Sequence, residues 1–271
     1  MSLDQPKSAD ALPSRDLMPK DLSPEAIQRR ISEQLRKTDA AAEKNQPSID
    51  SNHLREAVGN PEPPIFMWVK TGQIVGRPFF GGGKNGWEVE YGGREGRIEQ
   101  VRDEIMDSAA SVANIEHIFH PSDSGERIKL TEFDGPAGPI FIVEDGTHRV
   151  AGAKAANLDE IPCDVHTFSY PRELSTKNKN VAYEWEKRIK CGLISGKIDE
   201  LEDGAFVMTI RGEAVPWAAV SSQSKFLEIS KIYERIFPNG LQGLSVPREA
   251  LIDPVANNFF LSGRWSEWKD K

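Results

Sequence analysis

The sequence contains few cysteines and no long apolar run. Only Cys163 and Cys191 occur among its 271 residues, which excludes a disulfide scaffold or a cysteine-based zinc site and favours thiols that stay reduced. No stretch approaches the ~20 consecutive apolar residues that a membrane helix needs, and residues 1–20 lack the apolar segment of a secretion signal. We therefore expect a cytoplasmic protein that does not insert into a membrane.

A surplus of positive charge is also missing. The chain has 34 basic and 42 acidic side chains, and residues 51–170 hold the excess, with 11 basic against 19 acidic ones. Tight binding of duplex DNA relies on a basic surface that neutralises phosphates, so the composition disfavours a dedicated DNA-binding protein. The composition remains compatible with an enzyme that binds a nucleotide or DNA through a few arginines and a metal ion.

Helix signals begin at Ser23. Serine is a good N-cap, Pro24 suits the first helical position, and apolar residues recur four apart at Ile27, Ile31 and Leu35. This pattern predicts an amphipathic helix that packs on its own chain. We expect a flexible arm before it, over the polar residues 1–20, and a linker after it, at 44–51.

Strand and turn signals start at residue 64. The apolar and aromatic residues 65–69 predict a strand, and residues 73–75 are expected to pair back on it across a turn at 71–72. Residues 81–84 read Gly-Gly-Gly-Lys, but Asn85 follows where a phosphate-binding P-loop has Ser or Thr. A glycine-bearing hairpin is therefore favoured over a P-loop.

A helix is predicted over 97–112, followed by short strands at 115–119 and 128–130. Four acidic residues of that helix, Glu99, Asp103, Glu104 and Asp107, indicate a solvated face. His117 and His120 have a spacing that suits a metal site on a helix, but on a strand they point to opposite faces. The strand assignment therefore disfavours a metal site there.

Residues 138–165 carry the clearest pattern. The β-branched run 140–143 predicts a buried strand, Asp145-Gly146 a turn, and the alanine-rich segment that follows a short helix. The inner face of this helix is expected to hold Val150, Ala151, Ala155 and Leu158. Residues 162–168 predict the next strand, in which Cys163 alternates with Val165 as a core thiol and His166 could face the preceding turn.

The turn between Glu144 and Arg149 offers groups for phosphate chemistry. A helix that starts directly after a strand and a glycine presents backbone N–H groups and the positive end of its dipole, which together attract anions. Gly146 permits close approach, Thr147 offers a hydroxyl and Arg149 a charged donor. Asp145 or Glu144 could hold a divalent cation, and His148 can exchange protons near neutral pH. The alternative is that Asp145 and Thr147 only cap the helix while His148 and Arg149 are solvated.

The string from Asp145 to Arg149, placed between a buried strand and an alanine-rich helix that leads to Leu158-Asp-Glu-Ile-Pro162, resembles the signature box of the ParB/sulfiredoxin superfamily. In that family the box reads Asp-Gly-x-His-Arg or a Gly-x-x-Arg variant. The resemblance is specific over residues 140–165, suggestive back to about residue 48, and absent from 1–45 and 171–271. It implies that Gly146, His148 and Arg149, with Asp145 beside them, bind nucleotide phosphates and magnesium.

Members of this superfamily differ in activity. Sulfiredoxins have a cysteine where this sequence has Thr147, which argues against sulfinic acid reduction. In partition proteins a helix-turn-helix follows the box. Residues 171–271 of this sequence show no clear pattern of a recognition helix. Free serine kinases of this fold have a similar box, and plasmid-borne members that block conjugation or secretion-linked transfer show ATPase and nuclease activity.

The C-terminal third is expected to be mainly helical, with helices at 181–189, 198–201 and 222–236. Its last stretch contains Phe259, Phe260, Trp265 and Trp268, too many aromatic residues for a free tail, so we expect it to pack back. The predicted fold class is α+β. A ParB/sulfiredoxin-like domain with a small mixed sheet flanked by helices spans 48–170, after an arm and helix at 1–47 and before a helical extension at 171–271.

The function expected from the resemblance is that of a metal-dependent, nucleotide-binding phosphohydrolase. The expected activity is that of an ATPase, with DNase activity as a possible addition. In this role Asp145 positions Mg²⁺ with Glu144 nearby, His148 acts as general acid or base, and Gly146, Thr147 and Arg149 hold the phosphates of ATP or another nucleotide. DNA would be a substrate, and a transfer or secretion-system protein a partner. The alternatives are a non-catalytic, nucleotide-gated interaction module and a small-molecule kinase of the same fold.

Overall fold

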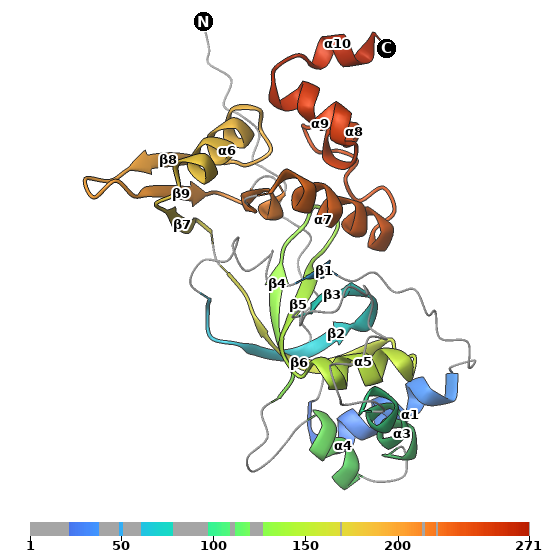
Figure 1. The fold of residues 1–271 in the computed structure, drawn as a ribbon. Helices are drawn as coiled ribbons and strands as arrows, with labels where there is room; N and C mark the ends of the chain where they lie inside the picture. The colour runs from blue at the N-terminus through green and yellow to red at the C-terminus, as the bar shows by residue number, and fades with distance from the viewer. Residues whose placement is uncertain are drawn as a thin grey trace, which may run out of the picture.

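Two β-sheets organise the protein. The computed structural model describes residues 22–37, 49–50, 61–77, 97–108, 112–119, 127–168, 170–212, 215–220 and 222–270. The flexible arm expected at 1–20, most of the linker at 44–51, the glycine-rich segment 81–84 and His120 lie outside these ranges. The fold class is α+β, with a mixed sheet flanked by helices (Figure 1).

The central sheet has six strands in the order β1-β3-β5-β4-β6-β2. Its pairs are mixed, because β3 runs parallel to β5 and β4 parallel to β6, whereas β4 with β5 and β2 with β6 are antiparallel. The strands span Ile49–Asp50 (β1), Ile65–Lys70 (β2), Ile74–Arg77 (β3), Lys129–Phe133 (β4), Ile140–Asp145 (β5) and Glu160–His166 (β6).

The hairpin expected between residues 65–69 and 73–75 is wrong. β2 pairs with β6 and β3 pairs with β5, so the two strands lie apart in the sheet. The short 3-10 helix η1 (Thr71–Gln73) connects them. The amide of Thr71 donates to the carbonyl of Asp159 at 2.9 Å, and its hydroxyl donates to the carbonyl of Leu158 at 2.5 Å. These bonds tie the connection to the start of β6 instead of folding β3 back onto β2.

Four helices cover one face of the central sheet (Figure 1). They are α1 (Pro24–Lys37), α3 (Arg97–Ser108), α4 (Val112–Phe119) and α5 (Thr147–Ala155). Ile27 and Ile31 of α1 are fully buried in the same apolar cluster as Phe141 and Val143 of β5. The helix predicted from Ser23 is therefore present, and it packs on its own chain as expected.

The strand expected at 115–119 is wrong, because these residues lie in α4. Ile115, Ile118 and Phe119 are buried while His117 is exposed, which is the three- and four-residue spacing of a helix with one buried face. A short apolar run with this spacing fits a strand or a helix equally well. Packing against α1 and the sheet decides the outcome.

The C-terminal region covers the other face. Val75, Phe133, Ile140 and Ile142 of the central sheet share an apolar cluster with its residues, among them the fully buried Trp217 and Tyr233. Its helical elements are α6 (Lys179–Lys190), η2 (Pro216–Ala219), α7 (Gln223–Ile236), α8 (Arg248–Ile252), α9 (Pro254–Leu261) and α10 (Trp265–Lys269). The central sheet is thus a layer between two cores.

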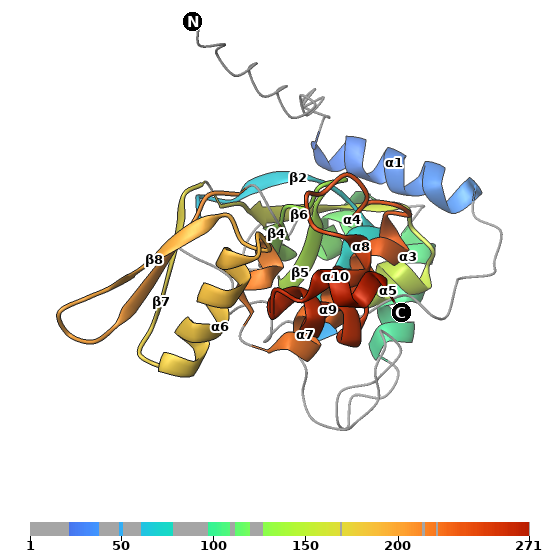
Figure 2. The ribbon, with the colours of Figure 1, turned by 90° about the horizontal axis from the view of Figure 1, so that it is seen from above.

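A second sheet in this region was not predicted. Its strands β7 (Arg172–Thr176), β9 (Phe206–Ile210) and β8 (Gly196–Glu200) pair in that order, all antiparallel. The sheet and α6 extend to one side of the molecule (Figure 2). The helix expected at 198–201 is therefore wrong, whereas those expected at 181–189 and 222–236 are present as α6 and α7.

The last aromatic residues pack back mainly on one another. The rings of Phe260 and Trp265 meet edge to face at 5.6 Å, and those of Phe259 and Trp268 lie 6.1 Å apart. Phe260 and Trp265 also contact the C-terminal core. Within the described ranges, no helix has both the length and the apolar character needed to cross a membrane.

Candidate functional site

The strand, turn, helix and strand predicted over residues 140–168 are present as β5, Gly146, α5 and β6. Gly146 is the N-cap of α5 and has φ 86° and ψ 25°, a left-handed conformation that favours glycine. A Cβ atom there would lie 3.0 Å from Cγ1 of Ile128 and 3.1 Å from Nη2 of Arg149. Since glycine has no side chain, none caps the first turn of α5 from this position. The turn therefore has the geometry expected of an anion site at a helix N-terminus.

Arg149 is directed toward the end of a neighbouring helix. Its Nη1 atom donates to the carbonyl of Ile118 in the last turn of α4 at 3.3 Å, and its Nη2 atom lies 3.9 Å from Oδ2 of Asp145. Its side chain is 21 % exposed. A guanidinium at the C-terminus of a helix satisfies carbonyl groups and complements the dipole. Arg149 therefore ties α4 to the start of α5, a structural role that the sequence did not predict.

Glu144 and Asp145 lie where the register between β5 and β4 shifts. Val143 pairs with Leu130 and Asp145 with Lys129, so Glu144 falls at a β-bulge, where the regular alternation of side chains is interrupted. Oε1 of Glu144 accepts a hydrogen bond from the hydroxyl of Thr131 at 3.1 Å. The carboxylate of Asp145 is 49 % exposed. The expectation that Glu144 assists at the turn stays a prediction.

Thr147 and His148 occupy the first turn of α5, and both are half-buried. The Nε2 atom of His148 is shielded from solvent. Proton exchange between this nitrogen and a ligand at the turn therefore requires the imidazole ring to rotate.

Magnesium fits this turn only together with a ligand. Among the residues that the structure describes, no three His, Cys, Asp or Glu side chains gather as a metal cluster. Mg²⁺ is usually held by one or two carboxylates, with substrate phosphates and water completing its octahedron. The exposed carboxylate of Asp145 suits a metal ion that arrives with a nucleotide, and it does not suit a tightly held resident ion.

Two other residues of β6, His166 and Cys163, were singled out in the sequence. Nδ1 of His166 is 3.3 Å from the carbonyl oxygen of Glu62, so His166 contacts the segment before β2. Cys163 is fully buried, and burial raises the pKa of its thiol well above the ordinary value. The prediction of a core thiol is confirmed.

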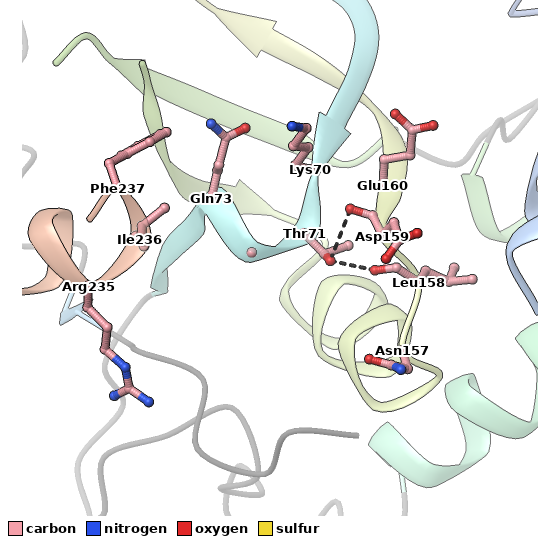
Figure 3. A pocket seen from close by; sticks show the side chains of 11 residues that line it. Lys70, Thr71, Gln73, Asn157, Leu158, Asp159, Glu160, Arg235, Ile236 and Phe237 are labelled. Atoms are coloured by element: carbon pink, nitrogen blue, oxygen red, sulfur yellow. Dashed lines mark hydrogen bonds between the residues drawn. The ribbon is translucent and has the colours of Figure 1, made fainter. Parts of the chain in front are cut away.

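A cavity that no sequence motif indicated lies at the other end of α5. Its volume is about 960 Å³, and its described walls come from β2 and η1, from the turn between α5 and β6, and from the end of α7 (Figure 3). These three segments are far apart in the sequence, so no motif could have revealed the cavity.

Lys154, in the last turn of α5, is the most unusual ionisable residue near this cavity. It is 4 % exposed, and its Nζ atom donates to the carbonyl of Thr71 at 2.5 Å. Burial lowers the pKa of its amine to about 7. A perturbed amine beside a cavity is a common mark of a functional region, although buried structural lysines show it too.

Comparison with known proteins gives no match: no family model, no curated protein and no solved structure is significantly similar to this chain. The resemblance to the ParB/sulfiredoxin superfamily therefore stays a prediction that rests on residues 140–165.

Proposed function

We propose that this protein binds the phosphates of ATP or another nucleotide at the N-terminus of α5 and hydrolyses them with magnesium, as a ParB/sulfiredoxin-like phosphohydrolase. The observation that carries the proposal is the junction of β5, Gly146 and α5. A buried strand ends there, a left-handed glycine turns the chain, and a helix starts with no side-chain cap from that glycine. Backbone N–H groups and the helix dipole favour phosphate at this position.

Each residue of the turn has a role in this proposal. The amides of the first turn of α5 and the Thr147 hydroxyl bind phosphate oxygens, and Asp145 holds the Mg²⁺ ion that accompanies the nucleotide. His148 transfers a proton after its ring rotates. Arg149, through Ile118 and Asp145, positions the turn. DNA as a phosphodiester substrate and a transfer or secretion-system protein as a partner extend the same proposal.

The direct test compares two glycine variants. Gly146→Ala strains φ 86° and places a Cβ against Ile128 and the Arg149 guanidinium, which should distort the turn, whereas Gly192→Ala imposes the same strain at φ 81° with no neighbour within 4 Å. Thermal unfolding is followed with ATP, ADP, CTP and GTP, with and without Mg²⁺. A nucleotide at 100 times its dissociation constant should stabilise wild type and Gly192→Ala by about 2.7 kcal/mol, and Gly146→Ala much less.

Two results would contradict the proposal. One is that no nucleotide raises the unfolding midpoint of the wild-type protein. The other is that Gly146→Ala and Gly192→Ala respond equally to the nucleotide that does bind, because the glycine would then not be part of the site.

A second function, a nucleotide-gated interaction module without turnover, is favoured by one feature of the turn. Nε2 of His148 is shielded from solvent. A protein that only binds nucleotide does not need this group. Release of inorganic phosphate by wild-type protein distinguishes the two functions: measurable release supports the hydrolase, and binding without release supports the interaction module.

A further inference from the structure

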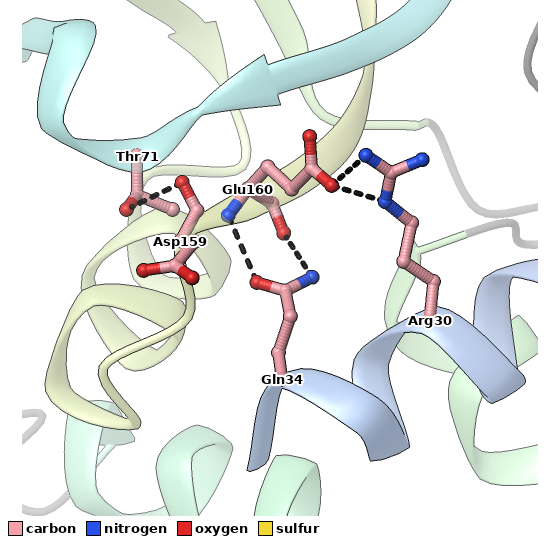
Figure 4. A network of polar contacts seen from close by, with 5 residues as sticks. All are labelled: Arg30, Gln34, Thr71, Asp159 and Glu160. Atoms are coloured by element: carbon pink, nitrogen blue, oxygen red, sulfur yellow. Dashed lines mark hydrogen bonds and ion pairs between the residues drawn. The ribbon is translucent and has the colours of Figure 1, made fainter. Parts of the chain in front are cut away.

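The central sheet shows how this protein closes backbone that a strand leaves open. β4 pairs with residues 164–166 of β6, so no strand of the described ranges lies opposite Glu160 on that side. The side-chain amide of Gln34 in α1 takes this place and exchanges hydrogen bonds of 3.0 and 2.9 Å with the carbonyl and the amide of Glu160 (Figure 4). Arg30 of α1 forms an ion pair with the Glu160 carboxylate. α1 thus satisfies backbone groups that would otherwise offer an edge for pairing.

The outer edge of β8 differs from this closed position. β8 is the last strand of the second sheet, and in the part of the chain that the structure describes only β9 pairs with it. Figure 2 shows that β8 and β9 project from the body of the molecule as a hairpin. An open strand edge presents N–H and C=O groups in a row, which can pair with another strand.

Hydrogen bonds at the two ends of β8 show which of its residues face this edge. The amide of Leu201 donates to the carbonyl of Ala205 at 2.7 Å, and the carbonyl of Ser195 accepts from the amide of Arg211 at 2.7 Å. In an antiparallel pair the backbone groups of successive residues point to opposite sides of the strand, so the odd-numbered residues of this stretch face β9. The even-numbered residues face the free edge: Gly196, Ile198 and Glu200.

The charges of β8 fit a second copy of the same strand. Lys197 and Asp199 are exposed on one face of the sheet, with Nζ of the lysine 2.6 Å from Oδ2 of the aspartate. When two β8 strands pair antiparallel with Ile198 opposite Ile198, each Lys197 lies opposite the Asp199 of the other copy. Opposite charges in such cross-strand positions stabilise a pair of strands.

The same charges disfavour the neighbouring registers. A shift of one strand by two residues places either Lys197 opposite Lys197 or Asp199 opposite Asp199, and like charges directly opposite each other destabilise the pair. A shift by one residue places groups that face β9 at the free edge, where they cannot pair. The sequence of β8 therefore selects a single register with itself.

Apolar side chains support this register. Ile198 is half-buried and packs against the C-terminal core, and at the two-fold axis it meets the Ile198 of the second copy. Leu201 follows β8 directly, and 48 % of its surface is exposed. In this register it lies opposite Ser195 of the second copy, so that pairing covers an exposed apolar side chain.

We propose that two copies of this chain dimerise through the outer edges of their β8 strands. The two three-stranded sheets then form one continuous antiparallel sheet. The backbone groups of the even-numbered residues make the hydrogen bonds across the axis, and two Lys197–Asp199 pairs flank Ile198. Since a single short strand gives a small interface, the association is reversible and lies in the micromolar range.

Sedimentation equilibrium of the full chain, from about 1 to 100 μM, measures the dissociation constant of the dimer. Asp199→Lys and Lys197→Asp each place like charges opposite each other at two positions of the interface. Each variant should raise the dissociation constant about tenfold or more. Both also break the exposed ion pair within the strand, which contributes little to the stability of the fold.

An equimolar mixture of Asp199→Lys and Lys197→Asp separates contact between copies from an effect within one copy. In a mixed dimer every lysine lies opposite an aspartate again, whereas like charges remain side by side within each strand. The mixture should therefore associate about as strongly as the wild type. Lys177→Asp is the control, because Lys177 is exposed and pairs with Asp203 at 3.1 Å but lies outside β8. It should change the dissociation constant by less than about twofold.

Four results would overturn the proposal. The wild-type protein stays monomeric over the whole concentration range, or Asp199→Lys associates as strongly as the wild type. The mixture associates no more strongly than its two components do alone, or Lys177→Asp weakens association as much as Asp199→Lys does.

Discussion

The two ends of α5 are built in different ways. At the N-terminal end, five consecutive residues from Asp145 to Arg149 form the whole turn, and its shape depends on the left-handed conformation of Gly146. At the C-terminal end, three distant segments meet, and the hydrogen bonds of Thr71 and Tyr233 hold them together. A single substitution can change the function of a local turn. A cavity assembled from distant segments depends instead on the packing of the whole molecule. The variants below test this difference.

The largest expected effect is at the N-terminal end. If His148 transfers a proton, His148→Ala should lower the rate of phosphate release by about 10²–10⁴-fold with nearly unchanged nucleotide affinity, because an acid or base acts mainly in the transition state. Steady-state phosphate release and nucleotide titration measure the two quantities. A variant that releases phosphate at the wild-type rate would show that His148 is not the catalytic acid or base.

Lys154, at the C-terminal end of α5, makes the stability of the protein depend on pH. Since burial lowers the pKa of its amine to about 7, the folded protein binds fewer protons at this site than the unfolded chain does between pH 7 and the ordinary pKa of lysine near 10.4. The free energy of unfolding therefore rises with pH in this window, by up to about 1.4 kcal/mol per pH unit from this group.

Lys154→Met keeps the length of the side chain and removes this titration. Denaturant unfolding between pH 7 and 9 should show that the stability of the wild type relative to the variant increases with pH. Lys231→Met, which changes an exposed lysine, should leave the wild-type slope intact. Equal slopes for wild type and Lys154→Met would show that the lysine titrates normally.

Two threonines give the smallest and most closely matched comparison. Thr71→Val keeps the shape of a buried side chain but deprives the carbonyl of Leu158 of its hydroxyl donor, so it should destabilise the protein by about 1–3 kcal/mol. Thr147→Val at the other end should change stability by no more than about 0.5 kcal/mol while weakening nucleotide binding. Chemical denaturation measures the first effect and titration the second. Equal losses of stability would mean that the two ends are not built differently.

Local patterns in the sequence predicted the local elements. The cap at Ser23 with four-residue apolar spacing predicted α1, and the apolar run before Asp145-Gly146 predicted β5 and α5. The same kind of pattern was insufficient for α4, since Ile115, Ile118 and Phe119 fit a strand or a helix until their partners are known.

Features that depend on distant contacts were not predictable. The pairing of β3 with β5 rather than β2 follows from hydrogen bonds between Thr71 and the start of β6, 88 residues away at Asp159. β8 has one apolar residue, Ile198, in its five positions, so its strand is stabilised by pairing with β9 and not by its own pattern. The cavity and the engagement of Arg149 with α4 also depend on contacts between separate segments.

Hydrogen–deuterium exchange of the full chain, with and without saturating ATP and Mg²⁺, tests the central claim most directly. Our account predicts that nucleotide slows exchange in the first turn of α5, at residues 146–149, because phosphate oxygens accept hydrogen bonds from these amides. Unchanged exchange in this turn, or slowing confined to the cavity segments 70–73, 157–160 and 235–237, would contradict the assignment of the nucleotide site to the N-terminus of α5.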